Sequence, residues 1–418
     1  MKHKYSETTV ASYGQRVKAG FVTSIVGLVL FCLSFVVLFL NEGSYIKTKK
    51  MLQTGLQSVI SIPSDEIDIK NNKALVHISN MAHSNQMLSD DDFGISISGI
   101  KLKRIVKMYQ WKEYKSQDSN VNMGGSETTT TTYEYKKVWE KDRIDSDNFR
   151  MNSYTNPYPL FSSNEKVNSN IEVGVFTISS NHINRFNEYI EFTMEMKKNT
   201  PKGFVVHENF LTNSEDITAP KIGDIKVYFE YIPLQTVSVI GAQDNNLIIP
   251  FATEYGDIVI SDEGSVTAYE MFSNELKSNQ IITWIVRFVG FLMMFTGLRM
   301  LLGVIGIIVS VLPFMQTTFA FISTPVVFLF SLALSILTIA LSWLFYRPLI
   351  SVALFVAIIF IWKKMKQVKA KKKQEIEEEI KKESASPISQ ILENSYNELE
   401  QKATDTKDKI VGILNKFK

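Results

Sequence analysis

Two long stretches of the chain contain no charged residue, and both lie near its ends. One runs from Ala19 to Asn41, and the other runs from Met300 to Tyr346, where Arg347 and Pro348 interrupt it. A helix needs about 20 apolar residues to cross the hydrocarbon core of a bilayer. The pattern therefore predicts an integral membrane protein with apolar helices near both ends.

We predict four transmembrane helices from the apolar segments and the breaks between them. They cover residues 19–41, 281–312 with a short interfacial segment, 317–346 and 348–362. Pro313 and the Arg347-Pro348 pair separate the last three, because proline interrupts the hydrogen bonding of a helix. The fourth span is short, so we expect its flanking lysines to snorkel toward the head groups.

Two arginines fall within the second predicted span. At about 100° per residue, Arg287 and Arg299 lie about 120° apart around the helix and do not share a face. In one interpretation each lies near an end of the span and snorkels, with Trp284 as an interfacial anchor. In the other, Arg287 makes a buried ion or lipid-phosphate contact, because charge inside a membrane is costly and often functional.

Charges beside the spans predict their orientation. Lysines follow the fourth span closely, which by the positive-inside rule indicates a cytosolic C-terminus. With four spans, the N-terminal segment 1–18 is cytosolic as well. Residues 42–280 then lie in the lumen of a eukaryotic organelle or in a bacterial periplasm. These lysines are Lys363, Lys364, Lys366, Lys369, Lys371, Lys372 and Lys373.

The polar region 42–280 has the composition of a β-rich α+β domain. Its predicted strands combine β-branched and aromatic residues between turn residues: Ala74–Ile78, Ile95–Trp111, Thr129–Trp139, Val173–Ile178, Ile225–Tyr231, Thr236–Ile240 and Asp257–Ser261. A hairpin loop is expected at Met123–Ser126. Amphipathic helices are expected at Lys50–Ser58, His182–Met194 and Thr267–Ser278.

The tail 363–418 is polybasic at first and coiled-coil-like afterwards. Its apolar residues recur at spacings of about 3 and 4, which is typical of a helix that pairs with another helix. They are Ile376, Ile380, Ile388, Leu392, Tyr396, Leu399, Ala403, Ile410, Leu414 and Phe417. Self-association or a partner helix is one interpretation. A solvated charged helix is another, and residues 407–418 on an anionic leaflet are a third.

Charge and residue types limit the chemistry. The net charge of +2 argues against nucleic acid as a partner. The single cysteine, Cys32, lies in the first apolar stretch, so the polar domain forms no disulfide. His77 and His83 are only a weak metal pair, and the five histidines form no HExxH motif. We predict no catalytic, cofactor-binding or metal-binding residue, and no cofactor.

Several ordered motifs resemble the LUMA family, also called transmembrane protein 43. They are Leu75-Val76-His77-Ile78, Leu88-Ser89-Asp90 with Phe93-Gly94, Lys101-Leu102-Lys103-Arg104 with Met108-Tyr109-Gln110-Trp111, Gly223-Asp224-Ile225-Lys226-Val227, Ile249-Pro250-Phe251, Glu275-Leu276-Lys277-Ser278-Asn279 and Trp343-Leu344-Phe345-Tyr346-Arg347-Pro348-Leu349. The resemblance covers roughly residues 20–362, matches poorly around 150–215, and leaves 366–418 without a counterpart. It implies four spans in the endoplasmic reticulum and inner nuclear membrane, a large luminal domain, and a role in organising membrane protein complexes.

We therefore expect a non-enzymatic, multi-pass membrane scaffold whose polar domain and tail recruit other membrane proteins. If the chain is bacterial, the resemblance places it in the cytoplasmic membrane with a periplasmic domain. The alternative is a protein that binds or handles lipids or small solutes, with Arg287 in a head-group site. A membrane hydrolase that uses an unidentified carboxylate pair ranks last.

Overall fold

The computed structural model describes residues 3–193, 201–207, 209–347, 359–360, 363–369, 371–372, 374 and 387–416. The chain forms two compact units, Met1–Ser342 and Trp343–Lys418. The first unit holds two large β-sheets, two two-stranded sheets and most of the apolar helices, and the second holds the tail.

Three described helices are long and apolar enough to cross a membrane: α1 (Tyr13–Ser58), α3 (Ala268–Ile308, continued by the 3₁₀ turn Val309–Val311) and α4 (Pro313–Tyr346). They cover the first three predicted spans. The predicted fourth span, 348–362, lies outside the described residues except for 359–360. The structure therefore shows an integral membrane protein with a β-rich domain, and it shows three candidate spans within the described part of the chain.

Capping boxes begin the two longest helices. Ser12 and Gln15 exchange hydrogen bonds at the start of α1, and Thr267 and Glu270 do so at the start of α3. The helices expected at Lys50–Ser58 and Thr267–Ser278 are not separate elements. They are the continuous ends of α1 and α3, which extend the apolar segments into the polar domain.

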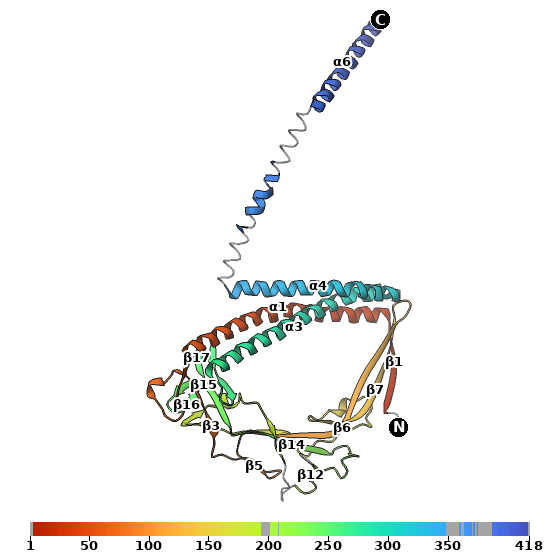
Figure 1. Ribbon diagram of the computed structural model, residues 1–418. Coiled ribbons are helices and arrows are strands. Elements are labelled where there is room, and N and C mark those ends of the chain that lie inside the picture. The colour runs from red at the N-terminus through yellow and green to blue at the C-terminus, as the bar shows by residue number, and fades with distance from the viewer. Residues whose placement is uncertain are drawn as a thin grey trace. The chain divides into compact units, whose positions relative to one another are not determined.

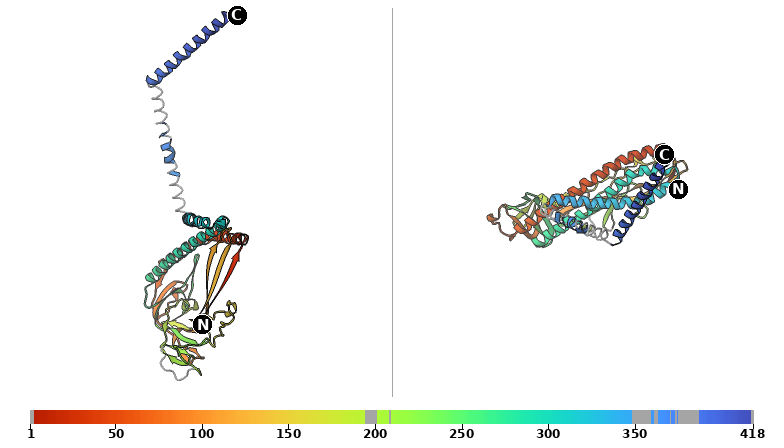
Figure 2. Two further views of the ribbon diagram at one scale, coloured as in Figure 1. Left: turned by 90° about the vertical axis from the view of Figure 1, so that its right-hand side faces the viewer. Right: turned by 90° about the horizontal axis from the view of Figure 1, so that it is seen from above.

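Helices α1 and α3 pack side by side along much of their length (Figures 1 and 2). Glycines allow this close approach. A Cβ atom added to Gly297 would lie 2.7 Å from the Phe31 nitrogen and 2.8 Å from the Gly27 carbonyl oxygen. A Cβ atom on Gly290 would meet Leu38 at 2.5 Å. Small residues bring membrane helices together in this way.

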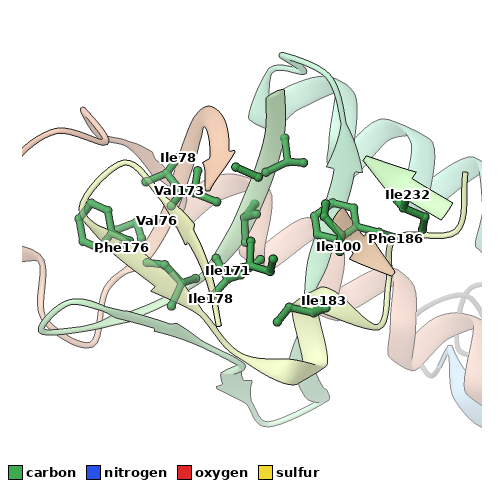
Figure 3. Packing of buried hydrophobic residues seen from close by; sticks show 14 residues of the cluster. Val76, Ile78, Ile100, Ile171, Val173, Phe176, Ile178, Ile183, Phe186 and Ile232 are labelled. Carbon is green, nitrogen blue, oxygen red and sulfur yellow. The ribbon is translucent and has the colours of Figure 1, made fainter. Parts of the chain in front are cut away.

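A small closed ring of strands forms the first sheet. The path β15–β16–β10–β9–β3 is closed because β3 also pairs with β15, and β2 and β19 attach to this ring. The strands are β2 (Ile60–Ser61), β3 (Leu75–His83), β9 (Ile171–Val173), β10 (Phe176–Ile178), β15 (Thr236–Asp244), β16 (Leu247–Ile249) and β19 (Ile260–Glu263). Figure 3 shows the core between them, where Ile78, Phe176 and Ile178 converge.

The second sheet has the order β1-β7-β6-β14-β13-β12, with β8 beside β6 and β11 beside β14. Its strands are β1 (Lys4–Ala11), β6 (Gly99–Val121), β7 (Glu127–Glu140), β8 (Asn164–Val167), β11 (Ile190–Glu191), β12 (Val205–His207), β13 (Phe210–Thr212) and β14 (Ile225–Pro233). Alternate residues Val227 and Phe229 on β14 enter a core with Phe93. The alternation of apolar and polar residues in this segment is the pattern from which we predicted the strand.

The remaining elements are short. Two-stranded sheets join β4 (Leu88–Asp90) to β5 (Ile95–Ile97), and β17 (Phe251–Thr253) to β18 (Gly256–Ile258). The 3₁₀ turns are Ile69–Asn71 and Ser146–Asn148. In the second unit, the tail helix α6 spans Pro387–Lys416.

Two sequence predictions are wrong in this region. The expected helix His182–Met194 is only the short α2 (Ser180–Ile183), and Ile190 pairs with Tyr231 in the sheet. The N-terminal segment 1–18 is not separate from the polar domain, because β1 pairs antiparallel with β7 from Lys4 to Ala11. The pairing partner lies more than a hundred residues away, where no local pattern reveals it.

Candidate functional site

Strands β1, β7 and the distal half of β6 form a polar ribbon that leaves the sheet domain and reaches the helices (Figure 1). Hydroxyl pairs line it: Ser6 Oγ lies 2.9 Å from Thr132 Oγ1, and Ser119 Oγ lies 2.8 Å from Thr129 Oγ1. Strand β14 covers β6 only as far as Met108. Loops still bond to the β6 backbone at Tyr109 and Trp111. Beyond Trp111, the described part of the ribbon has open edges, which hydrocarbon does not tolerate.

The tip of the ribbon is bound to the amino end of α1 by Arg16, which is only 6% exposed. The guanidinium donates to Glu127 Oε2 at 2.7 Å, to the Gly125 carbonyl at 2.5 Å and to Ser310 Oγ at 2.8 Å. A fourth bond reaches Gln316 Oε1 at 3.1 Å. One side chain therefore joins the ribbon, α1, the end of α3 and the start of α4.

Two hydrogen bonds to backbone carbonyls reinforce this junction. The Gly124 amide donates to the Val311 carbonyl at 3.0 Å, and the Tyr13 hydroxyl donates to the Ile308 carbonyl at 3.1 Å. Both carbonyls belong to the last turns of α3, where helix carbonyls lack partners within the helix. The ribbon thus caps the carboxyl end of α3.

A cavity of about 570 Å³ lies beside the junction. Its walls are polar at one end, with Thr9, Gln15 and Arg16, and apolar at the other, with Val304 and Ile307. This size lies within the usual range for small-molecule sites, about 300–1,000 Å³. A charged end and an apolar end match the shape of an amphiphile.

The far end of α1 is bound to the same domain. Leu52 of α1 and Phe272 of α3 pack with Leu75, Ile240 and Ile258 in one buried cluster. Both ends of α1 are therefore in contact with the sheet domain, through the ribbon at one end and the strand ring at the other (Figures 1 and 2).

A buried ion pair lies between α1 and α3. Arg287 donates to both carboxylate oxygens of Glu42, at 2.6 and 2.8 Å, and Glu42 is fully buried. The Arg287 guanidinium also lies 4.7 Å from the centre of the Trp284 ring. Of the two interpretations of Arg287, the structure supports the buried ion contact, and its partner is a side chain of α1. The snorkelling interpretation is wrong for this residue.

Arg299 has a different role. It donates to Ser323 Oγ at 3.1 Å and so joins α3 to α4. The two arginines contact different helices, as their angular separation predicted.

Buried histidines serve the fold. His182 donates through Nε2 to the Ile240 carbonyl at 3.0 Å, and its Nδ1 accepts from Ser179 Oγ at 2.9 Å. Burial lowers the pKa of His182 to about 4, so the ring is neutral at physiological pH. His77 bonds to Ser61 and to the Val266 carbonyl, and burial lowers its pKa too. The described residues contain no group of three or more His, Cys, Asp or Glu side chains placed to hold a metal.

The sequence did not reveal Arg16, Glu127 or Glu42. A charged residue just outside an apolar stretch is usually a sign of orientation, and Arg16 and Glu42 flank the first span in that manner. Their partners lie on distant elements, so only the folded chain brings each pair together.

Comparison with known proteins identifies the family. The model of the family described as Transmembrane protein 43 matches residues 108–348, which include the distal half of β6, the strands β7 to β19, α3 and α4 but not β1. The chain belongs to the transmembrane protein 43 family. Human Transmembrane protein 43 is 30% identical over 281 residues, covering 64% of this chain and 70% of the human protein.

The transmembrane protein 43 family extends beyond vertebrates. The Transmembrane protein 43 homolog of Drosophila melanogaster is 26% identical over 293 residues, covering 68% of this chain and 77% of the fly protein. The rat protein is 30% identical over 282 residues. No solved structure matches the chain. The residues that the family model matches include Glu127 and Arg287, whereas their partners Arg16 and Glu42 lie before the matched residues.

Proposed function

We propose that the protein is a non-enzymatic scaffold that organises membrane protein complexes. Its tail helix α6 carries the proposal. Apolar side chains on this helix are exposed to solvent: Ile391 62%, Leu392 65%, Tyr396 68%, Leu399 66% and Ile410 53%. Such a surface on a helix otherwise rich in charge is typical of a binding face for another helix.

Membership of the transmembrane protein 43 family supports a membrane location for this scaffold. The endoplasmic reticulum and inner nuclear membrane are the proposed compartments if the chain is eukaryotic, and the cytoplasmic membrane if it is bacterial. In this proposal the sheet domain, bound firmly to the helices at both ends of α1, presents a second recruiting surface. The partners are other membrane proteins and membrane lipids.

Cross-linking with mass spectrometry in native membranes tests this proposal. The full-length chain is compared with a chain that ends at Lys373. We expect the full-length protein to capture itself and defined membrane proteins, and the truncated chain to lose those captured through the tail. Capture of phospholipid alone by both chains would contradict the scaffold.

Lipid binding is the second candidate, and the cavity beside Arg16 favours it. In this alternative an amphiphile inserts its tail between Val304 and Ile307 and places its polar end near Gln15. Enlarging the small wall residue Gly303 with Gly303→Trp should reduce co-purified phospholipid without unfolding the protein, because a Cβ atom there meets nothing within 4 Å. Unchanged phospholipid would count against this alternative.

A further inference from the structure

The tail helix has opposite charge in its two halves. Residues 387–401 contain three acidic residues and no basic one, namely Glu393, Glu398 and Glu400. Residues 402–416 contain Lys402, Lys407, Lys409 and Lys416 against Asp405 and Asp408. Two such helices attract each other when they run in opposite directions, because the acidic half of each then lies against the basic half of the other.

We propose that α6 pairs with α6 of a second copy of this chain, antiparallel and centred on Gln401. This inference rests on the proposed scaffold function and names the partner of its tail. In this register Leu392 faces Ile410 of the second copy, and Leu399 faces Ala403. All four side chains lie on the same exposed face of the helix.

The flanking charges fit the same register. At about 100° per residue, Glu393 and Lys407 lie on one flank of the apolar face, and Glu398 and Lys402 lie on the other. A twofold axis across an antiparallel pair brings each flank against the same flank of the other copy. Glu393 therefore lies near Lys407 of the second copy, and Glu398 lies near Lys402 of the second copy. Beside the axis, Glu400 and Lys402 each lie near the same residue of the second copy, and these two like pairs offset part of the attraction.

A parallel pair would be repulsive. It sets the acidic halves side by side, with Glu400 near Glu398 of the second copy, and the basic halves side by side, with Lys407 near Lys409 of the second copy. Like charges at these flanking positions are destabilising and determine the orientation of paired helices. The opposite net charges of the two halves thus favour the antiparallel arrangement for two copies.

Cysteine cross-linking in the full-length chain tests the register. Cys32→Ser removes the single natural cysteine. Leu392→Cys and Ile410→Cys are then made in separate, differently tagged chains, which are expressed alone and together and oxidised in native membranes. We expect a cross-linked product only when both are present, since in the antiparallel pair two copies of either cysteine lie about 27 Å apart at about 1.5 Å per residue. A product from either variant alone would overturn the orientation.

Charge reversal provides the matched control. Glu393→Lys with Glu398→Lys in both chains should lower the cross-linked fraction at least tenfold, and adding Lys402→Glu with Lys407→Glu should restore it. Restoration excludes unfolding of the tail as the cause of the loss. Absence of product in every sample would overturn the pairing with a second copy. If the tail still captured other membrane proteins in that case, the result would support the scaffold function and contradict only the pairing of two tail helices.

Discussion

Breaking the Glu42–Arg287 pair should destabilise the helical layer strongly. Glu42 is fully buried, and the Arg287 side chain is only 12% exposed. Replacing Arg287 with Met leaves the carboxylate without the cation that holds both of its oxygens. Removing one partner of a buried pair costs roughly 3–5 kcal/mol, because the other charge is left desolvated. At about 2–4 °C per kcal/mol, the melting temperature should fall by about 6–20 °C.

Thermal unfolding of the purified protein in detergent measures this effect. The double variant Glu42→Leu with Arg287→Leu should recover much of the loss, since neither charge is then buried. The exposed pair Lys73–Asp244, at 2.9 Å, is the matched control, and Lys73→Met should cost less than about 1 kcal/mol. Equal melting temperatures for Arg287→Met and Lys73→Met would refute the reasoning.

Three further predictions concern packing, pH and redox state. Gly297→Ala should lower the melting temperature, because overpacking costs roughly 1–3 kcal/mol. Gly303→Ala in the same helix should not lower it, because a Cβ atom there meets nothing within 4 Å. Equal effects of the two substitutions would contradict the close contact of α1 and α3. Because the pKa of His182 is lowered to about 4 in the folded chain, the unfolded chain takes up the proton first as the pH falls. The stability associated with the neutral ring, roughly 3 kcal/mol, is therefore present above pH 6.5 and is lost as the pH falls toward about 4. Between pH 7 and pH 5, the melting temperature of the wild type should therefore fall more steeply with decreasing pH than that of His182→Gln. Equal slopes for the two proteins would refute this. Dithiothreitol should leave the melting temperature unchanged because Cys32 is the single cysteine, and a shift would contradict it.

The sequence predicted elements whose signal is local. Uncharged stretches located α1, α3 and α4, alternation located β7 and β14, and a run rich in β-branched residues located β15. Pro313 marks the break after the second span as predicted, and it begins α4 four residues before the predicted start of the third span at 317. The hairpin loop at Met123–Ser126 also lies between β6 and β7 as expected.

Long-range pairing was not predictable in the same way. Strand β1 has the polar composition of a flanking segment, and only its partner β7 gives it structure. The error at 182–194 has a specific cause. Ile183 and Phe186 recur at helical spacing, but they do so because a short turn directs both into the core of the strand ring. The same limit hid Arg16, whose four partners come from three other parts of the chain.

The ribbon that joins the amino end of α1 to the sheet domain is central to this account. Because β1 pairs with β7, we expect the two strands and the ribbon tip to lie on the same side of the membrane. The predicted separation of residues 1–18 from 42–280 by the bilayer does not fit this pairing. We therefore predict that both ends of α1 and both ends of α3 lie on the side of the sheet domain, although each helix is long and apolar enough to cross a bilayer.

Sided cysteine labelling tests this claim most directly. In the Cys32→Ser background, single cysteines replace Val10 on β1, Met123 at the ribbon tip and Met81 on β3, which are 66%, 75% and 44% exposed. Sealed vesicles are treated with a membrane-impermeant maleimide before and after permeabilisation. We predict that all three positions are labelled from the same side. Labelling of Val10 and Met123 only from the side opposite to Met81 would contradict the account.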